Sequence, residues 1–332
     1  MNMFQRTLRR VSPDFSPLIS MTIITLLAMS LIGPVFRSGH VSAQSDSDYV
    51  PIPEDGISEA GDYAGIIISD ELEREFLVHV PSGYDPETAV PVVITFHGFG
   101  DTAERHAARS EFIGLSDEEG FIVVVPQGRG ANATWRVSAA ANRRSRSDTQ
   151  FVRDLIVYMQ DLVNVDADRI YVTGFSMGGG LTQRLGCDLS DVVAAIGPVA
   201  GAYQPDDECE PVQTVPIITL HGLVDNTVPF NGGANRPNVG ELYEAWADWN
   251  ECSTIPSEEA LEDGVNSISW TDCKNDATVM IVTYDDLGHV FPEGGAALIW
   301  EFFEEHSRAD IGDDEADDVS DEDEEDLSGG VG

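Results

Sequence analysis

Short apolar runs recur along the middle of the chain, and polar or helix-patterned stretches separate them. Continuous runs of this kind are typical of strands that are buried on both faces of a sheet. An earlier pair of runs, 63–68 and 73–80, flanks the turn residues Ser69 and Asp70 and predicts a hairpin. The buried strands are predicted at 91–96, 121–125, 170–172, 192–196, 215–220 and 279–284.

Stretches with helical character lie between these strands. In 149–163 the apolar residues recur close to the spacing of a helix, and Asp101 or Thr102 can cap a helix over 101–110. Strands that alternate with helices in this order predict an α/β domain, with a mostly parallel central sheet covered by helices on both faces. The remaining helices are predicted at 181–185, 241–249 and 296–303.

The first 43 residues have the pattern of a secretory signal peptide. A basic start with Arg6, Arg9 and Arg10 precedes an uncharged apolar run at 18–33, and small residues at 41–43 suit cleavage before Gln44. The apolar run is long for a signal, so an uncleaved membrane anchor is the alternative. Residues 44–60 are polar, acidic and proline-bearing, which predicts a linker before a domain at 61–308.

Acidic residues outnumber basic ones, 59 against 18, for a net charge of −41. Such a charge repels nucleic acids and anionic membrane surfaces, so we expect neither as a partner. The predicted signal peptide makes us expect a secreted protein, and we expect it to be a monomer. The tail at 309–332 is mostly Asp and Glu and predicts a solvated, disordered segment. Calcium binding by this tail is the alternative, although the spacing does not fit an EF-hand loop.

The sequence Gly174-Phe175-Ser176-Met177-Gly178 follows a predicted strand and leads into a predicted helix. In that context a G-x-S-x-G forms a sharp turn that presents the serine hydroxyl as a nucleophile. A glycine-rich loop is the alternative, because the motif alone is common. The strand and helix around it favour the nucleophile.

A nucleophilic serine needs a base and an orienting acid, which follow in the order Ser, Asp or Glu, His in one large hydrolase fold. His289 follows the last predicted strand and is our expected base, with His221 as the rival. Asp225 lies in a loop after the strand at 215–220 and is our expected acid. The competing acids are Asp206, Asp207, Glu208, Asp285 and Asp286.

An oxyanion hole in that fold takes one N–H from the residue after the nucleophile, here Met177, and one from the loop after an early strand. That loop is His97 to Gly100, and we expect Phe99 to donate, with Gly98 as the rival. We expect His97 itself to support the loop rather than react. Trp135 could line the acyl or sugar side of the pocket, and ordinary core packing is its alternative.

Taken together, these motifs resemble those of the secreted esterases grouped as polyhydroxybutyrate depolymerases and feruloyl esterases, which have the α/β-hydrolase fold. The resemblance implies a single catalytic domain, with Ser176, Asp225 and His289 as its triad. It runs from Glu73 to Phe303. The motifs that carry it are His97-Gly98, Asp168 to Gly179, Pro198 to Gly201, Leu220 to Asp225 with Val228-Pro229, and Gly288-His289 with Pro292.

The chain departs from this family near the pocket. Met177 stands where the family often has Asn, and Phe291 stands where it often has Trp. We find no appended module for binding starch, cellulose or polyester. The resemblance leaves the ester open among feruloyl or acetyl esters on plant polysaccharide, short hydroxyalkanoate oligomers and simple short-chain esters. A non-catalytic secreted binding protein with the same fold is the alternative function.

Four cysteines, all after the predicted signal, allow three disulfide connectivities. Export favours disulfides over free thiols, and we expect the sequential pairs Cys187 with Cys209 and Cys252 with Cys273. No His, Cys or Asp cluster has the spacing of metal ligands, so we expect no metal and no cofactor.

Overall fold

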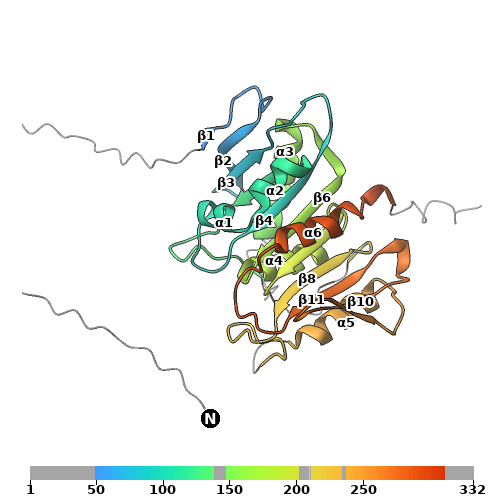
Figure 1. Ribbon diagram of the computed structural model, residues 1–332. Coiled ribbons are helices and arrows are strands. Elements are labelled where there is room, and N and C mark those ends of the chain that lie inside the picture. The colour runs from blue at the N-terminus through green and yellow to red at the C-terminus, as the bar shows by residue number, and fades with distance from the viewer. Residues whose placement is uncertain (1–48, 138–146, 202–208, 210, 234–236, 311–332) are drawn as a thin grey trace, which may run out of the picture. The chain divides into compact units, whose positions relative to one another are not determined.

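The computed structural model describes residues 49–137, 147–201, 209, 211–233 and 237–310. In this part of the chain the strands form one sheet in the order β1-β2-β3-β5-β4-β6-β7-β8-β11-β10-β9, which fans across the molecule in Figure 1. The strands are β1 (Val50–Pro51), β2 (Gly61–Ser69), β3 (Leu72–Val80), β4 (Val90–Phe96), β5 (Ile122–Pro126), β6 (Val165–Phe175), β7 (Ala195–Val199), β8 (Ile217–Gly222), β9 (Ser257–Glu262), β10 (Val265–Trp270) and β11 (Val279–Tyr284).

The centre of the sheet is parallel, and each end carries antiparallel strands. Neighbouring strands from β5 through β4, β6, β7 and β8 to β11 run in the same direction. The antiparallel pairs are β2 with β3, β3 with β5, β10 with β11 and β9 with β10. Parallel neighbours place their carboxyl ends at one edge, where ligand sites of open α/β sheets form.

Helices cover both faces of this sheet, as the sequence predicts. One buried cluster includes residues of α3, α4 and α5, and a second includes residues of α1, α2 and α6. In β4, Val92 and Ile94 belong to the first cluster and Val93 to the second, which explains the uninterrupted apolar run. The helices are α1 (Ala103–Arg109), α2 (Phe112–Glu119), α3 (Ser147–Leu162), α4 (Met177–Asp188), α5 (Val239–Trp249) and α6 (Gly295–Glu304).

The predicted linker at 44–60 needs correction over the residues that the structure describes. Val50 pairs with Tyr63 in a short strand at the edge of the sheet. Ile57 is only 3% exposed, and its N–H donates to the carbonyl oxygen of Leu162 at 2.9 Å. This segment is therefore part of the folded domain, because apolar residues among its polar ones pack against β2 and α3. The predicted signal, 1–43, and the tail from 311 onward lie outside the described residues.

The predicted elements differ from the structure in a few places. The strand expected at 192–196 is β7, which begins at Ala195. The sequence analysis missed α2, β9 and β10, and every residue of β9 is exposed. Within the described ranges, no helix combines the length and the apolar composition needed to cross a membrane.

The structure has both expected disulfides. Cys187, in α4, is bonded to Cys209, and Cys252, after α5, is bonded to Cys273, after β10. Each bond ties a helix or its end to a connecting segment beyond it. Closing loops of this size typically stabilises a fold by about 2–4 kcal/mol.

Candidate active site

Ser176 occupies a strained turn between β6 and α4. Its backbone lies at φ 57° and ψ −113°, outside the regions that most residues adopt. Its N–H donates to the carbonyl oxygen of Val199 on β7 at 2.8 Å, and its own carbonyl accepts from Gly180 at 3.0 Å. Such a conformation costs about 1–3 kcal/mol and persists only when neighbours hold it in place. The two hydrogen bonds hold it here.

The glycines of the turn allow a close approach of backbone to backbone. A Cβ atom on Gly178 would lie 2.1 Å from the carbonyl oxygen of Phe96, and one on Gly174 would lie 2.7 Å from the carbonyl of Gly178. The first turn of α4 therefore packs directly against the end of β4. This contact brings the start of the helix next to the loop that follows β4.

Three side chains from three strand ends meet at this turn. Nε2 of His289, in the loop after β11, lies 2.7 Å from Oγ of Ser176. Nδ1 of the same ring lies 2.7 Å from Oδ2 of Asp225, in the loop after β8. An ionised carboxylate only accepts hydrogen bonds, so Nδ1 carries the proton and Nε2 is free to accept from the serine hydroxyl.

The surroundings of Asp225 keep it ionised. Burial alone would raise the pKa of this carboxyl, but hydrogen bonds from His289 and from the N–H groups of Val228 and Thr227 outweigh it and lower the pKa. Those N–H groups donate to Oδ1 at 2.8 and 2.7 Å. One carboxylate oxygen is thus fixed by the backbone, and the other is left for the imidazole.

His221, the rival base, hydrogen-bonds to the backbone, and it is His289 that contacts Ser176. Its Nε2 donates to the carbonyl oxygen of Val228 at 2.8 Å, and it lies 3.8 Å from Oδ2 of Asp225. Burial lowers the pKa of this histidine, which keeps it neutral. The ring therefore supports the loop that carries Asp225. Of the rival acids, Asp285 and Asp286 are exposed, and 206–208 lie outside the described residues.

The loop between β4 and α1 lies against the serine. A Cβ atom on Gly98 would lie 3.3 Å from Cβ of Ser176. Phe99 is 60% exposed and lines the pocket in front of the serine. Among the described residues, neither the N–H of Phe99 nor that of Met177 donates to an acceptor.

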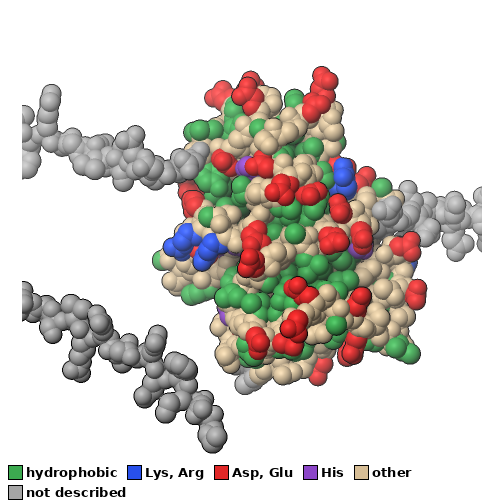
Figure 2. Space-filling view, viewed as in Figure 1, with side chains coloured by type: hydrophobic (Ala, Val, Ile, Leu, Met, Phe, Trp, Pro, Cys, Tyr) green, Lys and Arg blue, Asp and Glu red, His purple; other side chains and the backbone are tan. Residues whose placement is uncertain are grey.

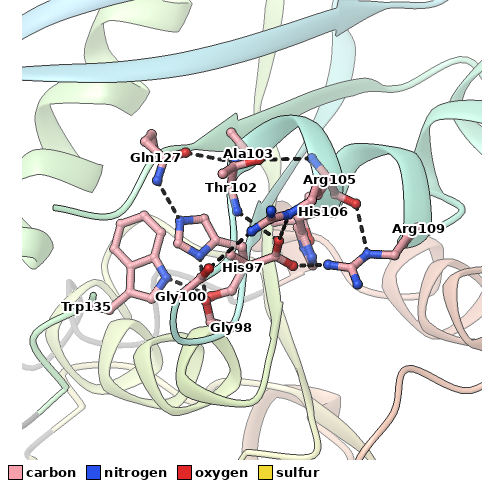
Figure 3. A network of polar contacts seen from close by, with 12 residues as sticks. His97, Gly98, Gly100, Thr102, Ala103, Arg105, His106, Arg109, Gln127 and Trp135 are labelled. Atoms are coloured by element: carbon pink, nitrogen blue, oxygen red, sulfur yellow. Dashed lines mark hydrogen bonds and ion pairs between the residues drawn. The ribbon is translucent and has the colours of Figure 1, made fainter. Parts of the chain in front are cut away.

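His97 anchors this loop through its ring, which Figure 3 shows between Gln127 and Gly98. The ring is buried, with Nδ1 donating to the carbonyl oxygen of Gly98 at 2.7 Å and Nε2 accepting from the N–H of Gly128 at 2.8 Å. Gln127 Oε1 accepts from the N–H of Ala103 at 2.9 Å, which ties the start of α1 to the same cluster. Burial lowers the pKa of His97, so the ring stays neutral and serves as a fixed support.

Trp135 belongs to this support and does not line the pocket. It is 4% exposed, its Nε1 donates to the carbonyl oxygen of His97 at 2.8 Å, and its ring packs against Phe96. Its backbone N–H points to the sulfur of Met177 at 3.4 Å. The expectation that Trp135 could contact the substrate is corrected. Its indole nitrogen is used in the hydrogen bond to His97, so the ring is buried against the loop and does not face the pocket.

A pocket of about 950 Å³ opens in front of Ser176 and His289. One part of its wall is apolar, with Phe99, Phe175 and Phe291. Another part comes from α1 and contains Arg105 and Arg109, which the sequence analysis did not single out. The signal available was a pair of arginines at helical spacing, directly after the His97-Gly98 loop of an acidic chain. Within the described ranges, no cluster of His, Cys, Asp and Glu could hold a metal ion.

The chain is similar in sequence to proteins that are named as esterases. The chain is 29% identical over 249 residues to "Feruloyl esterase B" of Piromyces equi, which covers 70% of this chain and 45% of that protein. It is 25% identical over 230 residues to "Bifunctional acetylxylan esterase/xylanase XynS20E" of Neocallimastix patriciarum, which covers 69% of this chain and 33% of that protein. The chain thus spans less than half the length of these two relatives.

Solved structures share the fold. An acetyl xylan esterase from Aspergillus awamori superimposes with a TM-score of 0.59 at 17% identity, covering 72% of this chain and 99% of that one. The feruloyl esterase module from Clostridium thermocellum complexed with sinapinate gives 0.52 at 15% identity, covering 77% and 92%. The sequence model of the Esterase family, described as "Putative esterase", matches residues 69–265, more than half of the chain. The chain therefore belongs to the Esterase family and has the α/β-hydrolase fold.

Proposed function

We propose that this protein is a serine carboxylester hydrolase in which Ser176 is the nucleophile, His289 the general base and Asp225 the orienting acid. The observation that carries the proposal is the continuous relay from Oγ of Ser176 through the imidazole to the carboxylate, with 2.7 Å at each step. A base within hydrogen-bond reach of a nucleophile, itself oriented by a third group, is the arrangement that nucleophilic catalysis requires.

The reaction follows from the proton positions. Nε2 of His289 takes the hydroxyl proton as Oγ of Ser176 attacks the ester carbonyl, and Asp225 stabilises the imidazolium that forms. The imidazolium then gives its proton to the leaving alkoxide as the C–O bond breaks, leaving an acyl-enzyme. Water attacks the acyl-enzyme with His289 again as base, which releases the acid and restores the serine.

Two backbone N–H groups complete the proposed site. Those of Met177 and Phe99 have no acceptor in the described part of the chain, and both belong to the segments that meet at Ser176. We assign them to the oxyanion of the tetrahedral intermediate. Loss of one such donor typically lowers kcat by about 10²–10³. The anchoring of the loop by His97 and Trp135 keeps this geometry fixed before substrate arrives.

The names of the relatives support feruloyl or acetyl esters as the substrate class, and the resemblance found in the sequence adds short hydroxyalkanoate oligomers. The pocket is of the size that takes a small aromatic or sugar ester. The signal-like start of the chain and the two disulfides support an extracellular location. We therefore propose soluble esters outside the cell as substrates.

The test of function is ester turnover by the wild-type chain and by Ser176→Ala. We expect hydrolysis of p-nitrophenyl acetate by the wild type and a loss on the order of 10⁴-fold or more in the variant. Equal turnover by both proteins would remove Ser176 from the mechanism. A panel of methyl ferulate, acetylated xylan, a hydroxybutyrate trimer and polymer film then assigns the substrate. Rapid clearing of the film without turnover of the soluble esters would overturn the proposed class.

A further inference from the structure

The side chains that line the pocket carry more positive than negative charge. Arg105 and Arg109 project from α1, as Figure 3 shows. Both pair with the single carboxylate of Asp101. Nε of Arg105 lies 2.7 Å from Oδ1, and Nη2 of Arg109 contacts Oδ2. No other Asp, Glu, Lys or Arg is among the lining residues. The wall beside Ser176 therefore carries a net charge of +1.

Two arginines that share one carboxylate are unusual among the arginines that the structure describes. In the other arginine–carboxylate ion pairs of the described residues, each carboxylate contacts one arginine side chain: the pairs are Arg74 with Asp148, Arg153 with Asp191, Arg169 with Asp166, and Arg184 with Asp188. Asp191 also interacts electrostatically with Arg308. The chain has 59 acidic residues for 18 basic ones, so carboxylates are not scarce. Figure 2 shows basic side chains gathered over α1 on a face whose other charged groups are mostly acidic.

The two guanidinium groups are held, yet they stay accessible. Nη2 of Arg105 donates to the carbonyl oxygen of Gly100 at 3.1 Å, and Nε of Arg109 donates to the carbonyl oxygen of Arg105 at 3.1 Å. Their side chains are nevertheless 60% and 65% exposed. Like charges four residues apart on a helix repel each other, and this repulsion works against the gain that Arg105 has from its pair with Asp101 and Arg109 has from its place in the last turn of α1. A guanidinium also has five N–H donors, more than these contacts use.

A second observation points to a ligand at the same wall. Ser110, at the end of α1, lines the pocket and is almost fully buried, and its hydroxyl has no hydrogen-bond partner in the part of the chain that the structure describes. Buried polar groups are nearly always hydrogen-bonded, so a buried hydroxyl without a partner calls for one. Its neighbour His106 does not add charge, because burial lowers its pKa to about 3.

We propose that Arg105 and Arg109 form a subsite that binds a carboxylate carried by the ester substrate. The inference rests on the proposed function and adds the substrate's charge to it. Guanidinium groups match the planar, two-oxygen geometry of a carboxylate. The net charge of +1 suits a monoanion, whereas the acidic surface repels polyanions. The apolar wall with Phe99, Phe175 and Phe291 receives the hydrocarbon part of the same substrate.

The test compares matched esters that differ by one carboxylate. For the acyl side we pair p-nitrophenyl butyrate with mono-p-nitrophenyl glutarate, and for the alcohol side we pair phenyl acetate with 4-carboxyphenyl acetate. The selectivity is the ratio of kcat/KM for the charged ester to that for the neutral one. We measure it for the wild type, Arg105→Gln and Arg109→Gln, with Arg153→Gln as a matched control whose arginine pairs with Asp191 away from the pocket.

We expect the wild type to favour the charged ester on at least one side. Each pocket variant should lower that selectivity roughly fivefold, mainly through KM, as expected for a lost charge-assisted hydrogen bond at a partly exposed site. Arg153→Gln should keep the wild-type ratio. Because both rates come from one preparation, partial unfolding cancels from the ratio. An unchanged ratio in both pocket variants, or no preference in the wild type on either side, would overturn the subsite.

A binding measurement separates this inference from the proposed function. Benzoate is titrated calorimetrically into Ser176→Ala, with and without Arg105→Gln and Arg109→Gln. Weaker binding after loss of the arginines supports the subsite even if no ester is turned over, in which case the proposed function alone has failed. Equal binding, or no binding to either protein, refutes the subsite even if the esters are hydrolysed.

Discussion

A Cβ atom on Gly178 would lie 2.1 Å from the carbonyl oxygen of Phe96, so the first turn of α4 touches the end of β4 with no room for a side chain. This contact sets the distance between the two segments to which we assign the oxyanion hole. It also explains why the serine motif ends in glycine, because any larger residue at position 178 would clash with the backbone of Phe96.

Gly178→Ala should therefore lower both stability and turnover. The added methyl group pushes α4 away from β4, which we expect to cost about 3 kcal/mol, at the upper end of overpacking effects. Moving α4 also moves Ser176 at its start, and a displacement of about 1 Å should lower kcat by about 10²-fold. Urea unfolding and ester kinetics measure the two effects.

Gly114→Ala is the matched control. Gly114 lies in α2, and nothing lies within 4 Å of its added Cβ atom. This change should raise stability by about 0.5–1 kcal/mol, as for alanine in place of glycine inside a helix. A Gly178→Ala protein as stable and active as the wild type would contradict the close packing.

Asp225→Asn should preserve the fold and remove most of the activity. The asparagine oxygen can still accept from the N–H groups of Thr227 and Val228, but its amide can donate to Nδ1 of His289. The imidazole proton then moves to Nε2, which can no longer accept from Ser176. We expect kcat to fall by about 10³–10⁴-fold. Steady-state kinetics with an unchanged unfolding midpoint check this. Asp285→Asn, at an exposed position in the loop that carries His289, should behave as the wild type.

His106 should make the fold sensitive to mild acid. It is buried against Thr95, with 2.8 Å between Nε2 and Oγ1, and burial lowers its pKa from 6.5 to about 3. The unfolded chain binds a proton below pH 6.5, whereas the folded chain does so only near pH 3, so stability falls as the pH drops through this window. The loss attributable to His106 is as much as about 5 kcal/mol.

The measurement is urea unfolding of the wild type and His106→Gln between pH 7 and pH 4. The wild type should lose more stability than the variant over this range, and the difference isolates His106 from the other buried histidines. Parallel curves for the two proteins would show that protonation of His106 is not coupled to folding.

Trp135→Phe tests the support beneath the loop that carries Phe99. The change keeps an aromatic ring against Phe96 but leaves the buried carbonyl oxygen of His97 without its donor. We expect a loss of about 1–3 kcal/mol in stability. The loosened loop should also lower kcat roughly tenfold with little change in KM, because the oxyanion is bound in the transition state. Trp249→Phe, at a partly exposed ring, is the control; a stability loss without any change in kcat would limit Trp135 to packing.

Much of the fold was predictable because its central strands are buried on both faces. Val92 and Ile94 pack on one face of β4 and Val93 on the other, so the sequence shows an unbroken apolar run. In contrast, β9 is exposed along its whole length, and its acidic sequence has no pattern that separates it from a loop. In α2 only Phe112 and Ser116 are buried, which leaves too weak a periodicity to predict a helix.

Ser176, Asp225 and His289, whose side chains the structure brings together, could be picked out from the sequence because chain order and strand ends restrict where each can lie. The distances between these side chains could not be predicted from the sequence, and neither could the direction in which a side chain points. Trp135 illustrates this limit, since an aromatic residue in a connection can line a pocket or support the loop beside it. Arg105 and Arg109 looked like ordinary polar positions of a surface helix until the structure placed them in the pocket with Ser176.

The most direct test of the central claim is labelling of the folded protein with a fluorophosphonate, followed by mass mapping of the modified peptide. Such a probe reacts with a serine that an adjacent base has activated. We predict one label per chain, located on Ser176, with loss of ester turnover in proportion to labelling and no labelling of His289→Ala. Folded protein that hydrolyses esters but carries no label on Ser176 would contradict the account.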